Sequence, residues 1–307
     1  MSQKLYISSS PHIHTNRTTK SIMADVIISL LPATVAGAII FGMRALLVIA
    51  VCVATTIISE FLFNKVTKRE QTIGDLSAAV TGLILGLNMP SSVPIWQAVF
   101  GSIFAIIVVK CFFGGLGCNV VNPAITAKVF MVVAFGSFVN AGFPVDAVAG
   151  ATPLEELEKG ILPDLSNLFV GNIGGAIGET CVIALLLGFA YLLIKKVITW
   201  HLPVSYILTT FVLTLAVLGG DVVTSLAYVM SGGLLLGAIF MATDYVTSPA
   251  TKVGKLIFGF GAGLITVAIR FWGIYPEGVS FAILLMNILN PYIEKWSELK
   301  IFGGKKA

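Results

Sequence analysis

The sequence has few charged residues for its length, and this shortage excludes a soluble globular protein. Of its 307 residues, 11% are charged and 57% are hydrophobic, and the mean hydropathy is +0.97. Soluble domains carry about 25% charged residues, so a soluble fold could not cover this much apolar surface with polar side chains. The composition therefore predicts a protein embedded in a membrane.

Cysteine and histidine, the usual metal ligands, are also scarce. The four cysteines lie far apart, at Cys52, Cys111, Cys118 and Cys181. They form no C-x-x-C pair, so their spacing predicts neither a zinc site nor a disulfide framework. Small buried apolar side chains are one interpretation; the alternative is that Cys111 and Cys118, which flank a glycine-rich turn, supply metal or cluster ligands together with a partner protein. His12 and His14 lack further ligands nearby, and docking on a partner is the simpler role.

A cleavable signal peptide is not evident, because the polar stretch from Met1 to Lys20 has no short apolar segment followed by a cleavage site. After it, apolar segments long enough to cross a hydrocarbon core of about 30 Å recur along the chain. We expect an all-α integral membrane protein with about ten transmembrane helices. They are placed near residues 22–41, 45–63, 74–89, 94–113, 123–139, 172–194, 203–219, 227–242, 254–272 and 278–293.

Lys and Arg are distributed unevenly between the two sides of such a membrane protein. With a cytoplasmic N-terminus, fifteen of the 19 lie on the cytoplasmic side, which is the side that retains positive charge. The net charge of +4 is thus a topology signal and does not indicate nucleic-acid binding. The chain divides into a cytoplasmic segment (1–21), a first half of five helices (22–139), an extracytoplasmic loop (140–171), a second half of five helices (172–293) and a cytoplasmic tail (294–307).

Two short apolar segments carry related sequences. Gly82-Leu-Ile-Leu-Gly86 matches Gly233-Leu-Leu-Leu-Gly237, 151 residues later, and polar residues and prolines follow both. A weaker echo pairs Lys110-Cys-Phe-Phe-Gly with Arg270-Phe-Trp-Gly. Related halves with an odd number of helices must have opposite orientations, so we expect inverted repeats with broken helices around a ligand or ion site. The alternative is that the glycines only permit close helix packing.

Ionisable residues within or beside the predicted helices are functional candidates, because charge at membrane depth is costly. They are Asp25, Glu60, Asp75, Lys128, Glu179, Asp244 and Arg270. Asp244 lies in Thr243-Asp-Tyr-Val-Thr247-Ser-Pro, a group of oxygen donors that suits a hard cation such as sodium, or the hydroxylated tail of a ligand. We name Asp244, Thr243, Thr247 and Asp75 as ion or ligand candidates. An ordinary interfacial loop explains the Asp244 segment equally well.

The loop between the halves contains a clear helix start. Thr152 is followed by Pro153 and then Glu155, the pattern of an N-cap, a first-turn proline and a capping-box glutamate. We expect a short surface helix from Pro153 to about Lys159. By itself, this pattern gives Thr152 only the role of a cap, which stabilises a helix by about 1 kcal/mol.

Four ordered sequence landmarks give the loop a further interpretation. They are Ser10-Pro-His-Ile-His, Gly114-Gly-Leu-Gly-Cys-Asn119-Val-Val-Asn122-Pro-Ala, Asp146-Ala-Val-Ala-Gly150-Ala151-Thr152-Pro-Leu and Thr243-Asp-Tyr-Val-Thr-Ser-Pro. Together they resemble the RnfD/NqrB family, and in length the chain is closer to the RnfD members, from the Rnf complex, than to the NqrB members, from the sodium-pumping quinone reductase. The third landmark is similar to the attachment motif for covalent FMN, although the family commonly has Ser or Thr where this chain has Ala149.

The resemblance implies that a separate flavin transferase joins FMN through its phosphate to Thr152, with Asp146, Gly150 and Ala151 as the rest of the motif. Small residues before Thr152 would leave its hydroxyl accessible, and the N-terminus of a helix favours phosphate. The resemblance also implies a second, noncovalent flavin, riboflavin or FMN, in the membrane region. We expect it near Asn119 and Asn122, because amide side chains at the end of a span can hydrogen-bond a flavin ring.

The function that the resemblance implies is electron transfer in the inner membrane of a prokaryote. Electrons would reach FMN from an extracytoplasmic flavoprotein and pass inward, coupled to Na+ or H+ translocation, in a multi-subunit complex that links ferredoxin and NAD. The alternative from another class is an inverted-repeat channel or transporter of the urea or ammonium type. Composition and repeats do not separate the two, whereas the loop motif favours the redox protein.

Overall fold

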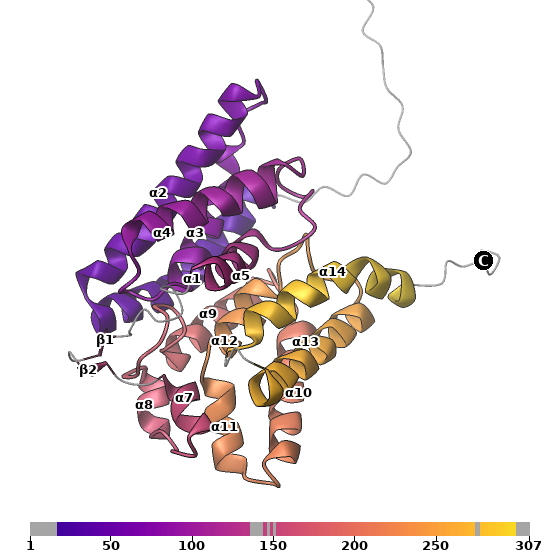
Figure 1. The fold of residues 1–307 in the computed structure, drawn as a ribbon. Coiled ribbons are helices and arrows are strands. Elements are labelled where there is room, and N and C mark those ends of the chain that lie inside the picture. Colours follow the sequence, from indigo (N-terminus) through magenta and orange to yellow (C-terminus); the bar gives the residue numbers. More distant parts are fainter. Residues whose placement is uncertain (1–16, 136–143, 146–147, 150–151, 274–276, 299–307) are drawn as a thin grey trace, which may run out of the picture.

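The computed structural model describes residues 17–135, 144–145, 148–149, 152–273 and 277–298, and this part of the chain is almost entirely helical (Figure 1). The first half contains α1 (Thr19–Phe41), α2 (Met43–Val66), η1 (Ile73–Asp75), α3 (Ser77–Leu87), α4 (Ile95–Ile103), η2 (Phe104–Cys111) and α5 (Pro123–Ala134). The segment between the halves holds β1 (Pro144–Val145), β2 (Val148–Ala149), α7 (Pro153–Glu158) and α8 (Leu165–Val170). The second half contains α9 (Val182–Ile194), α10 (His201–Val217), α11 (Val222–Met230), α12 (Leu234–Leu236), η3 (Gly237–Met241), α13 (Lys252–Trp272) and α14 (Val279–Ser297).

The long apolar helices confirm an integral membrane protein. Among the described residues, α1, α2 and α13 are each long and apolar enough to cross a membrane, and α11 with residues 234–241 forms a fourth if this bent pair counts as one span. Five shorter apolar helices of 10–17 residues accompany them. Their outer faces carry many exposed apolar side chains, as lipid contact requires. The expected number of ten spans stays a prediction.

Glycine allows the closest helix contacts in the first half. In α3, a Cβ added at Gly82 would lie 2.4 Å from the Thr56 hydroxyl and 2.7 Å from the Val53 Cα, and one at Gly86 would lie 3.0 Å from the Ile49 Cα. The backbones of α3 and α2 therefore approach each other closely, as small residues permit in membranes. At these two positions the close-packing interpretation is the correct one.

The eighth predicted span is broken, as expected, but its glycines do not correspond to those of α3. The chain bends by 62° between α11 and α12. Gly232 and Gly233 occupy this break with φ of 67° and 68°, a left-handed conformation that glycine adopts without steric cost. Gly233 thus precedes its short helix, whereas Gly82 lies inside α3. Leu76 is the left-handed residue that precedes α3, with φ of 65°, just as Gly233 precedes α12.

The sixth predicted span, 172–194, is wrong in its first ten residues. Helix α9 begins only at Val182, and residues 172–181 form an irregular segment. The backbone N–H groups of Ile177 and Gly178 donate to the carbonyls of Met89 and Leu87, at 3.1 and 2.8 Å, so they cap the end of α3 instead of continuing a helix. Irregular backbone survives at membrane depth when other parts of the protein satisfy it in this way.

The loop between the halves does not lie entirely in water, because part of it packs against the helices. Leu154, Leu157 and Leu168 are buried, and they form one apolar cluster with Ala227 and Tyr228 of α11. Figure 1 shows α7 and α8 lying beside α11. The second part of the loop is therefore fixed to the broken helix.

We predict that Gly82→Ala lowers the free energy of unfolding by about 1–3 kcal/mol, because the added methyl group overlaps backbone atoms of α2. The measurement is the thermal unfolding midpoint of the purified chain in detergent. Gly74→Ala is the matched control, since a Cβ there would meet nothing within 4 Å. Equal midpoints for the two variants would contradict the close contact between α2 and α3.

Candidate functional site

Thr152 has the cap geometry that its sequence predicts. It is the N-cap of α7, with Pro153 in the first turn; its Oγ1 accepts a hydrogen bond from the Glu155 N–H, and the Glu155 carboxylate accepts one from the Thr152 N–H, both at 3.3 Å. This capping box is therefore confirmed, and α7 extends from Pro153 to Glu158 as expected. Asp146, Gly150 and Ala151, the rest of the expected attachment motif, lie outside the described residues.

The cap is held against the broken helix by its neighbours. Leu154 lies so close to the break that a Cβ on Gly232 would approach its Cδ1 to 2.1 Å. Leu157 packs in the same apolar cluster with Tyr228 of α11. Contacts with α11 and with Gly232 in the break thus determine where the Thr152 hydroxyl lies.

Thr152 lines a cavity of about 140 Å³, which we name the Thr152 cavity. Its polar walls come from five elements that lie far apart in the sequence, and the apolar walls come mainly from α5 and the start of α14. The polar lining residues are Thr152, Glu155, Asn88, Lys128, Glu179, Thr180, Glu277 and Ser280, and the larger apolar ones are Val129, Val132, Leu154, Ile173 and Phe281. A ring with one polar edge and two apolar faces suits such a lining.

Lys128 is the cation of this cavity, and two carboxylates approach it. Its Nζ donates to Glu277 Oε1 in a short ion pair and to Asn88 Oδ1 at 3.2 Å. Only 4% of the Lys128 side chain is exposed, against 31% for Glu277. Glu179 Oε1 accepts from the Ala176 N–H at 2.9 Å, whereas its Oε2 is buried without a hydrogen-bond partner in the described residues. An unsatisfied buried oxygen is costly, and it faces this polar group.

Gly233 brings the two carboxylates together. A Cβ at this position would lie 2.6 Å from Glu179 Oε2 and 3.2 Å from Glu277 Oε1. Arg270, which is also buried, does not enter this gap but binds the broken backbone: it donates to the carbonyls of Tyr228 at 2.6 Å, Ser231 at 3.0 Å and Glu277 at 3.2 Å. Arg270 thus satisfies the carbonyls at the break, whereas a larger side chain at Gly233 would displace the carboxylates of Glu179 and Glu277.

A second cavity, of about 90 Å³, brings together four of the residues that the sequence singled out. Asn119, Asn122, Thr243 and Asp244 all line it, and we name it the Asn122 cavity. Ser77, Thr81 and Lys110 of the first half also line it, as does Tyr245. Thr247 and Asp75 are not in this lining: Thr247 donates to Asp244 Oδ2 at 3.1 Å, and Asp75 accepts from Ser77. Asp75 and Asp244 therefore do not form one site.

Hydrogen bonds already occupy part of each predicted side chain in the Asn122 cavity. Asn122 Oδ1 accepts from the N–H groups of Ala124 and Ile125 as the N-cap of α5, and its Nδ2 donates to the Met241 carbonyl at 3.2 Å. Asn119 Nδ2 donates to the Val121 carbonyl at 3.1 Å. Burial raises the pKa of the Asp244 carboxyl, and the hydrogen bond from Thr247 opposes that rise. Among the described residues, no group of three or more His, Cys, Asp or Glu side chains could hold a metal ion.

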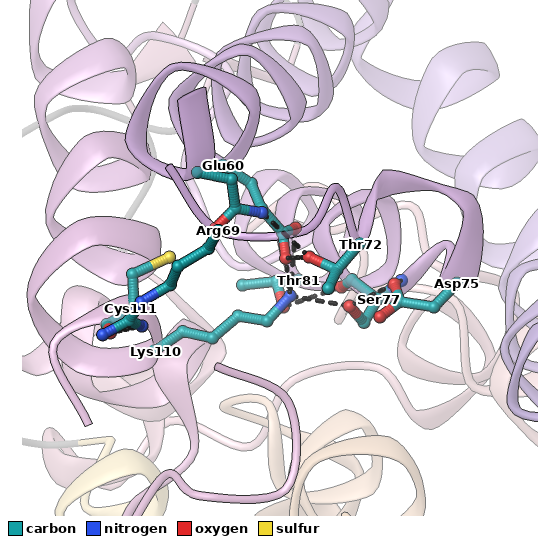
Figure 2. Close-up of polar contacts among 9 residues, drawn as sticks. Glu60, Arg69, Thr72, Asp75, Ser77, Thr81, Lys110 and Cys111 are labelled. Atoms are coloured by element: carbon teal, nitrogen blue, oxygen red, sulfur yellow. Dashed lines mark hydrogen bonds and ion pairs between the residues drawn. The ribbon is translucent and has the colours of Figure 1, made fainter. Parts of the chain in front are cut away.

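A buried ion pair stands at the edge of the Asn122 cavity (Figure 2). Lys110 Nζ donates to both carboxylate oxygens of Glu60, at 2.9 and 3.0 Å, and to Ser77 Oγ at 2.6 Å. Ser77 donates in turn to Asp75, and Thr72 Oγ1 donates to Glu60 at 2.7 Å. The side chains of Lys110 and Glu60 are 3% and 2% exposed. The network joins α2, η2 and the start of α3.

Lys110 and Arg270, paired by the weaker sequence echo, have comparable positions. The Lys110 side chain, from η2, binds Ser77 at the start of α3, just after the left-handed Leu76. The Arg270 side chain, from α13, binds Ser231 in the break, which also contains the left-handed Gly233. Each half thus places one buried cation where its short helix begins.

Three residues of these sites do not stand out in the sequence as site candidates. Glu277 lies between the last two predicted spans and looks like an ordinary interfacial carboxylate, and Lys110 enters there only as a topology signal and through the weak echo with Arg270. Asn88 begins a polar tail after a short apolar segment, which is the signal that could have identified it. Cys111 is buried and Cys118 exposed, and the described residues give neither a metal cluster.

The chain is similar to known proteins over nearly its whole length. Residues 6–303 match the family described as NQR2, RnfD, RnfE. The D subunit of the Na(+)-translocating ferredoxin:NAD(+) oxidoreductase complex of Acetobacterium woodii is 44% identical over 310 residues, which cover 98% of this chain and 96% of that protein. The D subunit of the proton-translocating ferredoxin:NAD(+) oxidoreductase complex of Clostridium ljungdahlii is 39% identical, with 98% and 96% covered. The D subunit of the ion-translocating oxidoreductase complex of Aliivibrio salmonicida is 33% identical, with 98% and 99% covered.

We predict that Lys110→Met lowers the free energy of unfolding by about 3–5 kcal/mol, because it leaves the Glu60 carboxylate buried without its cation. Adding Glu60→Gln to this variant should recover a large part of the loss, since the double variant buries no net charge. Chemical unfolding in detergent micelles measures both. Lys65→Met, an exposed lysine on α2, is the control and should change stability by less than about 0.5 kcal/mol. Losses that simply add would show that the pair is not coupled.

Proposed function

Because the chain belongs to the NQR2, RnfD, RnfE family, we propose that it is the membrane electron-transfer subunit of an ion-translocating ferredoxin:NAD oxidoreductase complex and carries FMN covalently on Thr152. As one component of a translocase it is not catalytic alone. Two relatives are named as D subunits of ferredoxin:NAD(+) oxidoreductase complexes and a third as the D subunit of an ion-translocating oxidoreductase complex, which supports the assembly. The Thr152 motif supports the cofactor.

The observation that carries the FMN proposal is the position of Thr152 in the wall of a cavity that has both polar and apolar lining residues. Its hydroxyl is fixed by the cap of α7 beside the polar group of Asn88, Lys128 and Glu179. The apolar side chains of Val129, Val132 and Phe281 provide contact surface for ring faces. A phosphoester at Thr152 would tether the group, and these residues would hold its ring. When bound, FMN supplies the one- and two-electron chemistry, while the protein provides position and electrostatics.

For the second, noncovalent flavin, riboflavin or FMN, we propose the Asn122 cavity. The amide of Asn119 and the hydroxyl of Thr243 offer hydrogen-bond donors and acceptors, and Leu116, Val197, Ile198 and Phe240 supply apolar walls. This cavity and the Thr152 cavity are lined by opposite ends of α3, by Ser77 in one and by Asn88 in the other. Two flavins in these cavities would lie near the two ends of α3.

The other parts of the proposal concern topology and partners. We place the protein in the inner membrane of a prokaryote with both termini cytoplasmic and the Thr152 loop outside. An extracytoplasmic flavoprotein and other Rnf-type subunits would be its redox partners, and a flavin transferase would attach FMN. The coupled ion is Na+ or H+, since the names of two relatives specify different ions. The family match favours this function over the channel or transporter alternative.

We expect Thr152→Asn to abolish covalent flavin while the protein still inserts and folds. Asparagine keeps an N-cap acceptor for α7 but has no hydroxyl for a phosphoester. The full chain is coexpressed with a flavin transferase, and a denaturing gel is inspected for flavin fluorescence beside an intact-mass measurement. Thr18→Ala, which removes the N-cap acceptor of α1, is the matched control and should stay fluorescent. A dark wild-type band without the added mass of FMN minus water, or a fluorescent Thr152→Asn band, would overturn the attachment at Thr152.

The second flavin has its own test. We predict that Asn119→Leu reduces by at least about tenfold the flavin released from the purified chain by acid, because the variant loses a polar ring contact of roughly 1.4 kcal/mol or more. Covalent fluorescence on the gel should not change, which separates the two flavins. Asn167→Leu, on the exposed surface of α8, is the control. Unchanged release would show that the noncovalent flavin does not bind in the Asn122 cavity.

A further inference from the structure

Lys128 is a cation placed where it can act on whatever the Thr152 cavity binds. It projects from α5, which belongs to the first half, into a cavity otherwise formed largely by the Thr152 loop and the second half. Among the described residues that line the cavity, it alone carries positive charge. The second buried cation nearby, Arg270, is committed to backbone carbonyls at the helix break.

The charge of Lys128 is only partly cancelled by its neighbours. Glu277 accepts its short hydrogen bond but is 31% exposed, so solvent weakens the field of this carboxylate. Asn88 fixes the ammonium group through Oδ1 without adding charge. Glu179 lies beside Gly233, where its Oε2 and Glu277 Oε1 approach the same point. Its Oε2 has no hydrogen-bond partner among the described residues, so it does not neutralise Lys128 directly.

We propose that Lys128 raises the reduction potential of the FMN on Thr152, and that Glu277 lowers it. This inference rests on the proposed attachment of FMN at Thr152. Reduction adds negative charge to a flavin, and a buried cation beside it stabilises the reduced form more than the oxidised form. The Glu277 carboxylate in the same cavity has the opposite effect. Water is largely excluded around Lys128, so these interactions are stronger there than at an exposed surface.

Substitutions that remove the charge of Lys128 or of Glu277 should therefore shift the reduction potential of the flavin in opposite directions. Removing Lys128 leaves the Glu277 carboxylate in the cavity without its cation, which disfavours the reduced flavin. Removing the Glu277 charge leaves Lys128 still held by Asn88 and no longer paired, which favours the reduced flavin. A purely structural role of the ion pair would not produce opposite shifts, because either substitution breaks the same contact.

The experiment is a spectroelectrochemical titration of the covalent flavin in the full chain, coexpressed with a flavin transferase and purified in detergent. The Thr152→Ala chain, titrated in parallel, supplies the signal of any noncovalent flavin for subtraction. We expect Lys128→Met to lower the midpoint potential by at least about 59 mV for a one-electron step, which is a tenfold change in the ratio of affinities for reduced and oxidised flavin. Glu277→Gln should raise it, and Lys128→Arg, which keeps the charge, should leave it near the wild-type value.

Lys159→Met, an exposed lysine just after α7, is the control for distant charge and should not shift the potential. Gel fluorescence tests attachment separately, so a dark wild-type band would reject the proposed function itself. If Lys128→Met loses its flavin, Glu277→Gln decides: a raised potential supports the inference, and an unchanged or lowered one overturns it. Shifts of the same sign in Lys128→Met and Glu277→Gln, or no shift in fluorescent variants, would also overturn it.

Discussion

Arg270 satisfies the carbonyls of a broken helix, and the architecture of the Thr152 cavity depends on that interaction. Backbone groups without partners cannot persist in an apolar environment, so a break at membrane depth needs donors from within the protein. Arg270 supplies them to Tyr228, Ser231 and Glu277. The irregular segment 172–181 meets the same requirement differently, by donating to the carbonyl end of α3. Both solutions place irregular backbone, which can carry polar side chains inward, around one cavity.

The two halves meet this constraint with related parts. Each has a short helix that follows a left-handed residue, Leu76 or Gly233, and a buried cation near that start, Lys110 or Arg270. The cations differ in what they bind. Lys110 is neutralised by the Glu60 carboxylate, whereas Arg270 is satisfied mainly by carbonyls, which leaves Glu179 and Glu277 available to the Thr152 cavity. The two halves therefore use a short helix and a buried cation in the same way, but one cation is paired with a carboxylate and the other with backbone carbonyls.

The sequence predicted the class of fold and the local structure well, and for clear reasons. Low charge and long apolar segments require a membrane, and the Thr-Pro-x-Glu pattern of Thr152 specifies a cap through bonds within four residues. It predicted the sixth span badly, because hydropathy does not distinguish an apolar helix from an apolar irregular segment whose N–H groups find partners on α3. The sequence repeat also aligned Gly82 with Gly233, although Gly82 lies inside a helix and Gly233 lies at a break.

What the sequence determined by itself is the chemistry available: a membrane protein of this family, a threonine in an attachment motif, and a few ionisable residues at apolar positions. Which of these meet was decided only by the tertiary structure. Asn119, Asn122, Thr243 and Asp244 line one cavity, while Asp75 is not part of its lining and accepts a hydrogen bond from Ser77. Thr152, Lys128, Glu179 and Glu277 line the other. Local patterns reach only a few residues, whereas these groups are joined by helix breaks and loop docking that depend on contacts between distant parts of the chain.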